Sequence, residues 1–274
     1  MHPILMHWGT HRLYSYTALV CAGVVLGVAY ALWRMRSSLP NSSGLAGAGD
    51  WGILDAATWA LAGGAIGARA TYVAGNWQDY AGGLAALWQD WGGGLVFQGG
   101  LLAGLLALWL HSLRVRRPLA RLLDAAAPGV ALGQSIGWAG ALMHGANYGM
   151  VMRSPFSLWL PDLYGVYAPR LPTQVLASLL GLGLFLGLHR LSRFRLVPGM
   201  LGLIYLFGNG LGHFALGFTR ADETVFLGPL RATQWAELGE VVVASIVMLC
   251  IWRGVRMSGV RGRRPYAPKE SGAA

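Results

Sequence analysis

The chain has 274 residues, of which 55% are hydrophobic and only 12% are charged, and its mean hydropathy is +0.48. A soluble domain usually carries about 25% charged residues, so this composition excludes that class and indicates a membrane protein with several spans. The net charge of +10 does not indicate nucleic-acid binding, because the arginines lie in short loops between apolar stretches. Both cysteines, Cys21 and Cys250, lie within apolar stretches, so we predict neither a disulfide nor a metal site.

Seven apolar stretches approach the length of about 20 mostly apolar residues that a helix needs to cross a membrane. The predicted spans are 13–33, 53–73, 94–113, 125–144, 174–191, 198–217 and 235–252. No convincing cleavage site follows the first stretch, so we expect a retained helix there. The sequence therefore predicts an all-α membrane protein. Residues 1–257 form one transmembrane domain, and residues 258–274 form a disordered basic cytoplasmic tail.

The distribution of basic residues predicts the orientation of the chain. With seven spans, fifteen of the 21 Lys and Arg residues lie on one side of the membrane and five lie on the other, with Arg69 inside the second span. Cytoplasmic loops carry the excess of Lys and Arg, so we expect the N-terminus outside and the C-terminus in the cytoplasm. The five residues on the outer side are Arg12, Arg153, Arg170, Arg220 and Arg231.

Three connections are predicted to lie outside. Residues 74–93 contain no basic residue and alternate Trp and Tyr with Asp79 and Asp90, which predicts an amphipathic segment in the membrane interface. Residues 150–173 contain four prolines and are predicted to form a small outer cap. Residues 218–234 form the third outer loop.

Polar residues within the spans gather in the outer third of the membrane. Taken singly, each is explained by helix packing or by an interhelix hydrogen bond. Packing residues would not be confined to one depth, so together they predict a site for a lipid, or for a soluble group, at the level of the outer leaflet. The residues are Arg69, Tyr72, Gln98, His144, Asn147, Gln174, Asn209 and His213.

The stretch Gly133–Gly149, GQSIGWAGALMHGANYG, has two interpretations. Its glycines allow neighbouring membrane helices to approach closely, which indicates a packing seam. Its polar end, with His144, Asn147 and Tyr148, is also suited to form a floor for a lipid headgroup.

The order of these features resembles the bacterial prolipoprotein diacylglyceryl transferase family from about residue 51 to residue 250. The resemblance implies a seven-span enzyme of the bacterial inner membrane that needs no cofactor. Such an enzyme transfers a diacylglyceryl group from phosphatidylglycerol to the lipobox cysteine of a prolipoprotein and releases glycerol phosphate. The matching stretches are GARATY at 67–72, GGGLVFQGGLLAG at 92–104, the stretch 133–149, RLPTQ at 170–174, PGM at 198–200, GNGLGHF at 208–214 and FTR at 218–220.

Several polar residues of the family's motifs are replaced in this chain. Trp138 and His213 stand where the family has arginines, and Gln98 stands where it has a histidine. Further replacements of the family's Asn and Glu residues are Ala141, His144, Ala146 and Gly217. The residues that keep the family's chemistry are Arg69, Tyr72, Gly149, Arg170, Gln174 and Arg220.

The candidate site residues are assigned roles from the resemblance and from their shared depth. The family's two arginines are expected to bind the phosphate and stabilise the charge on the leaving group. His213 and His144 are the candidate catalytic residues that would compensate for their loss, one as a cation and one as a base for the thiol. The candidate headgroup-binding residues are Arg69, Tyr72, Gln98, Trp138, Asn147, Gly149, Gln174, Asn209 and Arg220.

The sequence leaves several functions open. The chain is either a divergent transferase or a non-catalytic lipid-binding or accessory protein that kept the fold. A different acyl or glyceryl transfer, with histidine as the base, fits the replacements equally well. A transporter or channel is disfavoured, because polar residues do not extend through the full depth and no repeat is visible.

Overall fold

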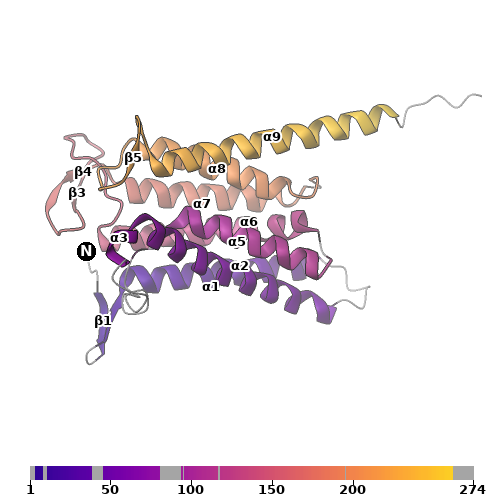
Figure 1. Cartoon of the computed structure of the whole chain (residues 1–274), viewed down its shortest axis with the longest axis horizontal. Coiled ribbons are helices and arrows are strands. Elements are labelled where there is room, and N and C mark those ends of the chain that lie inside the picture. Colours follow the sequence, from indigo (N-terminus) through magenta and orange to yellow (C-terminus); the bar gives the residue numbers. More distant parts are fainter. Residues whose placement is uncertain are drawn as a thin grey trace, which may run out of the picture.

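The computed structural model describes residues 4–8, 11–38, 46–80, 94, 96–116, 118–194 and 196–261. Within these residues, seven long helices lie side by side and alternate in direction (Figure 1). They are α1 (Ser15–Ser38), α2 (Ala46–Gly75), α5 (Phe97–Arg114), α6 (Leu119–His144), α7 (Thr173–Leu191), α8 (Met200–Gly217) and α9 (Ala232–Arg261). A short helix, α3 (Trp77–Tyr80), follows α2.

The long helices confirm the predicted all-α membrane protein, and each overlaps one predicted span. Four of them contain a stretch that is long and apolar enough to cross a membrane. These stretches are Ser15–Arg34, Thr173–Leu191, Met200–Gly217 and Ala232–Gly254. The other three long helices include polar residues such as Asp55, His111 and Gln134. The seven-span topology and the orientation of the termini therefore stay predictions.

Three two-stranded antiparallel hairpins, which the sequence analysis did not predict, lie at one end of the bundle (Figure 1). We call this end the hairpin end. Each hairpin contains only a few residues, so its alternation of polar and apolar side chains is too short to read from sequence. The pairs are β1 (Ile4–Trp8) with β2 (His11–Tyr14), β3 (Leu158–Pro161) with β4 (Tyr167–Arg170), and β5 (Phe226–Leu227) with β6 (Leu230–Arg231).

Glycines let the helices pack backbone against backbone. A Cβ atom at Gly27 of α1 would lie 2.5 Å from the carbonyl oxygen of Gly129 of α6, and one at Gly23 would lie 2.6 Å from that of Gly133. Such contacts exclude a side chain at these positions, as expected where membrane helices approach closely. The first part of the 133–149 stretch therefore lies in a packing seam.

A buried apolar cluster fixes α6, α7 and α8 against one another. It contains Ala127 and Ala131 of α6, Leu188 of α7, and Leu201 and Tyr205 of α8. The predicted site residues of α6 and α8 (Trp138, His144, Asn209 and His213) lie beyond this cluster, toward the hairpin end. The cluster therefore sets the distance between two helices that carry predicted site residues.

Two predictions fall partly outside the described residues. Of the expected interfacial segment 74–93, the structure describes residues 74–80, which hold the end of α2 and α3, and residues 81–93 are not described. Of the expected tail 258–274, residues 258–261 extend α9, and residues 262–274 are not described. The expected cap at 150–173 is described and contains the β3–β4 hairpin.

Candidate functional site

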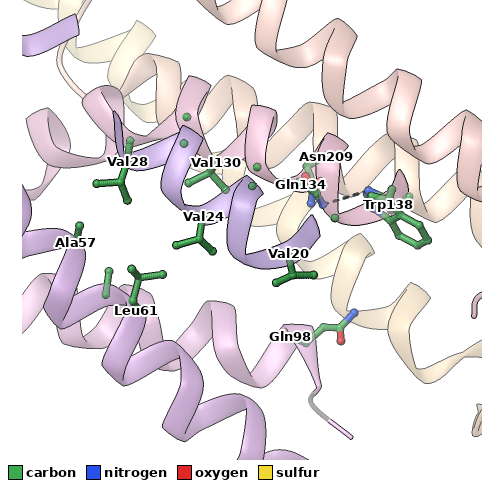
Figure 2. Close-up of a pocket in the computed structure, with 18 of the residues that line it drawn as sticks. Val20, Val24, Val28, Ala57, Leu61, Gln98, Val130, Gln134, Trp138 and Asn209 are labelled. Atoms are coloured by element: carbon green, nitrogen blue, oxygen red, sulfur yellow. Dashed lines mark hydrogen bonds between the residues drawn. The ribbon is translucent and has the colours of Figure 1, made fainter. Parts of the chain in front are cut away.

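A cavity of about 710 Å³ lies between helices of both halves of the chain. One part of it is apolar and lies between α1, α2 and α6 (Figure 2). The width of this part is set by small and β-branched side chains, and it is suited to hold hydrocarbon. Its lining includes Val20, Val24, Val28, Ala57, Leu61 and Val130.

The other part of the cavity is polar and lies nearer the hairpin end. Six of the predicted site residues line it: Gln98, Trp138, Asn147, Asn209, His213 and Arg220. They come from α5, α6, α8 and the loops that follow α6 and α8, so the fold brings distant segments to one cavity. Its lining also includes three polar residues that sequence reasoning missed, Gln134, Glu237 and Glu240.

Trp138 of α6 and His213 of α8 form a stacked pair in this polar part. Their ring centroids are 5.2 Å apart and their planes differ by 20°. The Tyr205 hydroxyl donates to Gln134 Oε1 at 3.0 Å, and the Gln134 Nε2 atom lies 3.2 Å from His213 Nε2. An imidazole that accepts this amide N–H at Nε2 carries its proton on Nδ1. The network therefore fixes His213 as a hydrogen-bond donor through Nδ1.

Arg220 is held by an acidic and an amide side chain. Its Nε and Nη2 atoms donate to the Asp222 carboxylate at 2.8 and 2.6 Å, and Nη2 also donates to Asn147 Oδ1 at 2.7 Å. Arg231 shares the same carboxylate at 3.4 Å. Burial lowers the pKa of Arg231, and the charge of Asp222 opposes this change. Two guanidinium groups, one of them the cavity-lining Arg220, thus share one carboxylate.

The loop after α6 is fixed to the loop after α8. The Met150 amide donates to the Thr219 carbonyl, and the Ala221 amide donates to the Tyr148 carbonyl, both at 2.9 Å. A Cβ atom at Gly149 would lie 2.1 Å from the Leu171 carbonyl oxygen, so the close approach of this third segment requires glycine. Gly149 therefore contributes to the site by allowing Asn147 and Arg220 to meet.

Gln174, which was predicted to contact the headgroup, lies under the same loop. Its side chain is buried, and its Nε2 atom donates to the Ala146 carbonyl at 2.9 Å. Arg170, at the end of β4, forms an ion pair with Asp162 at 2.9 Å and lies 4.7 Å from the centre of the Tyr148 ring. Both residues hold the loop that carries Asn147, and neither is part of the described cavity lining.

Arg69 and Tyr72 form a separate group near the end of α2 that lies at the hairpin end. The Arg69 guanidinium lies 5.5 Å from the centre of the Tyr72 ring and 5.6 Å from that of Tyr80, and it donates to the Tyr80 hydroxyl at 3.4 Å. Neither Arg69 nor Tyr72 is among the described residues that line the cavity. The fold therefore places these two predicted residues beside the site.

His144 and His213 lie in different surroundings. The His144 ring stacks on Tyr16 of α1 at 5.9 Å and meets Tyr14 edge-on at 6.4 Å. Its Nδ1 atom is buried and has no hydrogen-bond partner among the described residues. Tyr16 itself lines the cavity, so His144 lies behind the lining that His213 forms directly.

The missed glutamates lie one turn apart on α9, opposite Asn209 of α8. Asn209 Nδ2 donates to Glu240 Oε2 at 3.3 Å, and Glu237 is only 8% exposed. Ionisable residues inside a membrane span are rare and usually functional. The spacing of Glu237 and Glu240 in the apolar run after Trp235 is the signal that would have revealed them.

A family model described as prolipoprotein diacylglyceryl transferase matches residues 3–251 of the chain. Curated relatives named phosphatidylglycerol–prolipoprotein diacylglyceryl transferase match nearly all of it. The relative from Synechococcus elongatus is 32% identical over 263 residues, covering 91% of this chain and 86% of its own length. The relative from Gloeobacter violaceus is 30% identical over 254 residues, which cover 89% of this chain and 90% of the relative. The relative from Streptococcus suis is 29% identical over 262 residues, covering 92% and 93%. The matched region includes β1, β2 and α1, which precede the motifs found by sequence reasoning.

Proposed function

This chain belongs to the prolipoprotein diacylglyceryl transferase family, and from that premise we propose that it transfers a diacylglyceryl group from phosphatidylglycerol to the lipobox cysteine of a prolipoprotein. The reaction is proposed to occur at the outer leaflet of the plasma membrane, with the hairpin end outside. Seven spanning helices, one transmembrane domain and a cytoplasmic C-terminus complete the proposed arrangement.

The observation that carries this proposal is the division of the cavity into an apolar and a polar part. The apolar part between α1, α2 and α6 is suited to acyl chains, and the polar part to a headgroup. A diacyl phospholipid has the same division, with its ester-bearing glyceryl group at the boundary. The reacting carbon would then lie close to Trp138, His213 and Arg220.

The proposed step exchanges one bond for another. The cysteine sulfur forms a bond to the glyceryl carbon that carries the phosphate, while the bond from that carbon to the phosphate oxygen breaks. Glycerol phosphate leaves with the bonding electrons, and the thiol proton goes to a base. A leaving phosphate needs positioned hydrogen-bond donors.

Two residues supply donors for the leaving group in this proposal. His213 is held by Gln134 so that Nδ1–H is its donor, and Arg220 has Nη1 without a hydrogen-bond partner among the described residues. The candidate base is His144, whose Nδ1 lacks a partner in the described part of the chain. Its ring stacks on the cavity-lining Tyr16, so a base at this place would act at the edge of the cavity.

A transfer assay tests the proposal directly. Purified protein is incubated with phosphatidylglycerol and a lipobox peptide, and the peptide mass is measured. The expected result is the addition of one diacylglyceryl group to the cysteine. The same peptide with serine in place of cysteine is the control and should remain unmodified. Unmodified peptide in both samples, with lipid still bound to the protein, would contradict the proposal.

The stacked Trp138–His213 pair favours a second candidate function, a lipid-binding or accessory protein. The resemblance implies arginines at these two positions. Because losing one preorganised donor typically lowers the rate by about two to three orders of magnitude, their replacement disfavours catalysis. Expression in cells depleted of their own transferase separates the two functions. A transferase restores mature lipoproteins, whereas an accessory protein leaves the precursor unmodified.

A further inference from the structure

The polar part of the cavity contains two buried oxygen atoms without hydrogen-bond partners. They are Asn209 Oδ1 and Glu237 Oε2, and no described residue donates to either of them. Asn209 is 2% exposed and Glu237 is 8% exposed, and both line the cavity. Buried polar atoms nearly always have partners in folded proteins, so two orphaned acceptors in one cavity indicate a missing donor.

Asn209 and Glu237 lie on α8 and α9, two helices that pack tightly against each other at this level. A Cβ atom at Gly210 would lie 2.8 Å from the Glu237 carbonyl oxygen and 3.2 Å from Glu240 Cβ. Asn209, next to Gly210, donates through Nδ2 to Glu240, and no described residue donates to its Oδ1. Asn209, Glu237 and Glu240 thus form an acceptor cluster on two facing helices.

The charges around the cluster do not supply the missing donor. The charged groups that act on Glu237 are Arg220 and Glu240. Arg220 already bonds Asp222 and Asn147 through Nε and Nη2, and no hydrogen bond joins it to the cluster. Two carboxyl groups and an amide oxygen in a cavity of low dielectric constant disfavour an anion and favour a hydrogen-bond donor.

We propose that Asn209, Glu237 and Glu240 form a headgroup subsite that binds the hydrogen-bond donors a phospholipid carries beyond its phosphate. Hydroxyl groups and an ammonium group share this chemistry. The phosphate itself would lie toward Arg220 Nη1, and the acyl chains toward the valines of α1. This inference rests on the proposed function only in requiring that the cavity holds a phospholipid.

The subsite makes a prediction about which lipids bind. Phosphatidic acid ends at its phosphate and offers nothing to the acceptor cluster. Phosphatidylglycerol extends the phosphate by two hydroxyl groups, and phosphatidylethanolamine extends it by an ammonium group. Losing a hydrogen bond to a charged group changes affinity by about tenfold or more. Phosphatidic acid is therefore expected to bind at least about tenfold more weakly than one of the other two.

The test measures binding of the three lipids, with identical acyl chains, to the purified full chain by native mass spectrometry. Glu237→Gln replaces one acceptor oxygen by a donor and should reduce the preference over phosphatidic acid about threefold to tenfold. Glu237→Leu removes both oxygens and should abolish the preference. The matched control is Glu223→Gln, the same change at an exposed glutamate outside the cavity, which should leave the preference unaltered. Thermal unfolding of each variant in detergent verifies that it is folded.

The outcomes separate this inference from the proposed transfer reaction. A preference for phosphatidylglycerol identifies hydroxyl groups as the donors, and one for phosphatidylethanolamine identifies the ammonium. Either preference, if lost in a folded Glu237 variant, supports the subsite even when no transfer occurs. Equal binding of all three lipids to the unaltered protein would mean that water satisfies these oxygens, and it would overturn the inference. An undiminished preference in a folded Glu237→Gln protein, or any preference that survives in a folded Glu237→Leu protein, would overturn it as well.

Discussion

Trp138 and His213 stack on one another across the interface of α6 and α8, with ring centroids 5.2 Å apart. The sequence resemblance implies arginine at both positions, and two neighbouring guanidinium groups would bind a phosphate as cations. Here the pair presents an aromatic surface with the imidazole N–H of His213 and the indole N–H of Trp138 as donors. Any transfer chemistry in this cavity therefore depends on fewer fixed positive charges than the family's motifs imply.

Replacing His213 tests whether its Nδ1–H acts on the leaving group. His213→Ala should lower kcat for transfer by about two to three orders of magnitude, because a positioned donor is lost. His213→Gln keeps an N–H donor and should recover part of the rate. The matched control is His189→Ala, at the end of α7 opposite the hairpin end, which should retain the rate of the unaltered protein. The role is wrong if His213→Ala transfers at the unaltered rate.

Replacing Arg220 tests whether its forked hydrogen bonds organise the site. Arg220→Lys keeps the charge but cannot bond Asp222 through two nitrogens and reach Asn147 as well. We expect kcat/KM to fall about tenfold or more, from the loss of hydrogen bonds worth about 1.5–3 kcal/mol. Arg153→Lys, at an exposed position in the cap, is the control. Equal kinetics for the two lysine variants would show that the fork has no function.

Two glycine-to-alanine substitutions, one at the contact and one as a control, test the packing of α1 on α6. Gly27→Ala places a methyl group 2.5 Å from the Gly129 carbonyl oxygen and should lower the free energy of unfolding by about 1–3 kcal/mol. Gly183→Ala is the matched control, since a Cβ atom there meets nothing within 4 Å. It should leave stability unchanged or raise it by up to about 1 kcal/mol. Thermal unfolding in detergent compares the two, and equal stabilities would contradict the predicted close contact.

Cysteine labelling tests the predicted orientation. Cys21 and Cys250 are both exposed, so both are first replaced by alanine. Single cysteines are then introduced as Arg153→Cys in the cap and Arg193→Cys after α7, two exposed positions at opposite ends of the bundle. A membrane-impermeant maleimide added to sealed cells should label the first and spare the second. If only Arg193→Cys is labelled, the orientation of the chain is the opposite of the predicted one.

The sequence determined the helices because the physical signal is local. A run of apolar residues must form a helix in a membrane to satisfy its own backbone, so composition along the chain predicts each long helix without knowledge of its neighbours. The predicted spans 174–191 and 198–217 differ from α7 and α8 by at most two residues at either end. The site residues Asn209 and His213 were found because a helix places residues four apart on one face.

The tertiary structure decided which of the predicted polar residues share the cavity. Arg69 and His144 both lie near the hairpin end of their helices, but position along a helix does not specify which side of it a neighbour covers. Gln174 and Gly149 proved to hold loops together, because their partners are backbone carbonyls of segments distant in sequence. Glu237 and Glu240 lie in the site because α9 packs on α8 at Gly210, a contact that no local sequence pattern predicts.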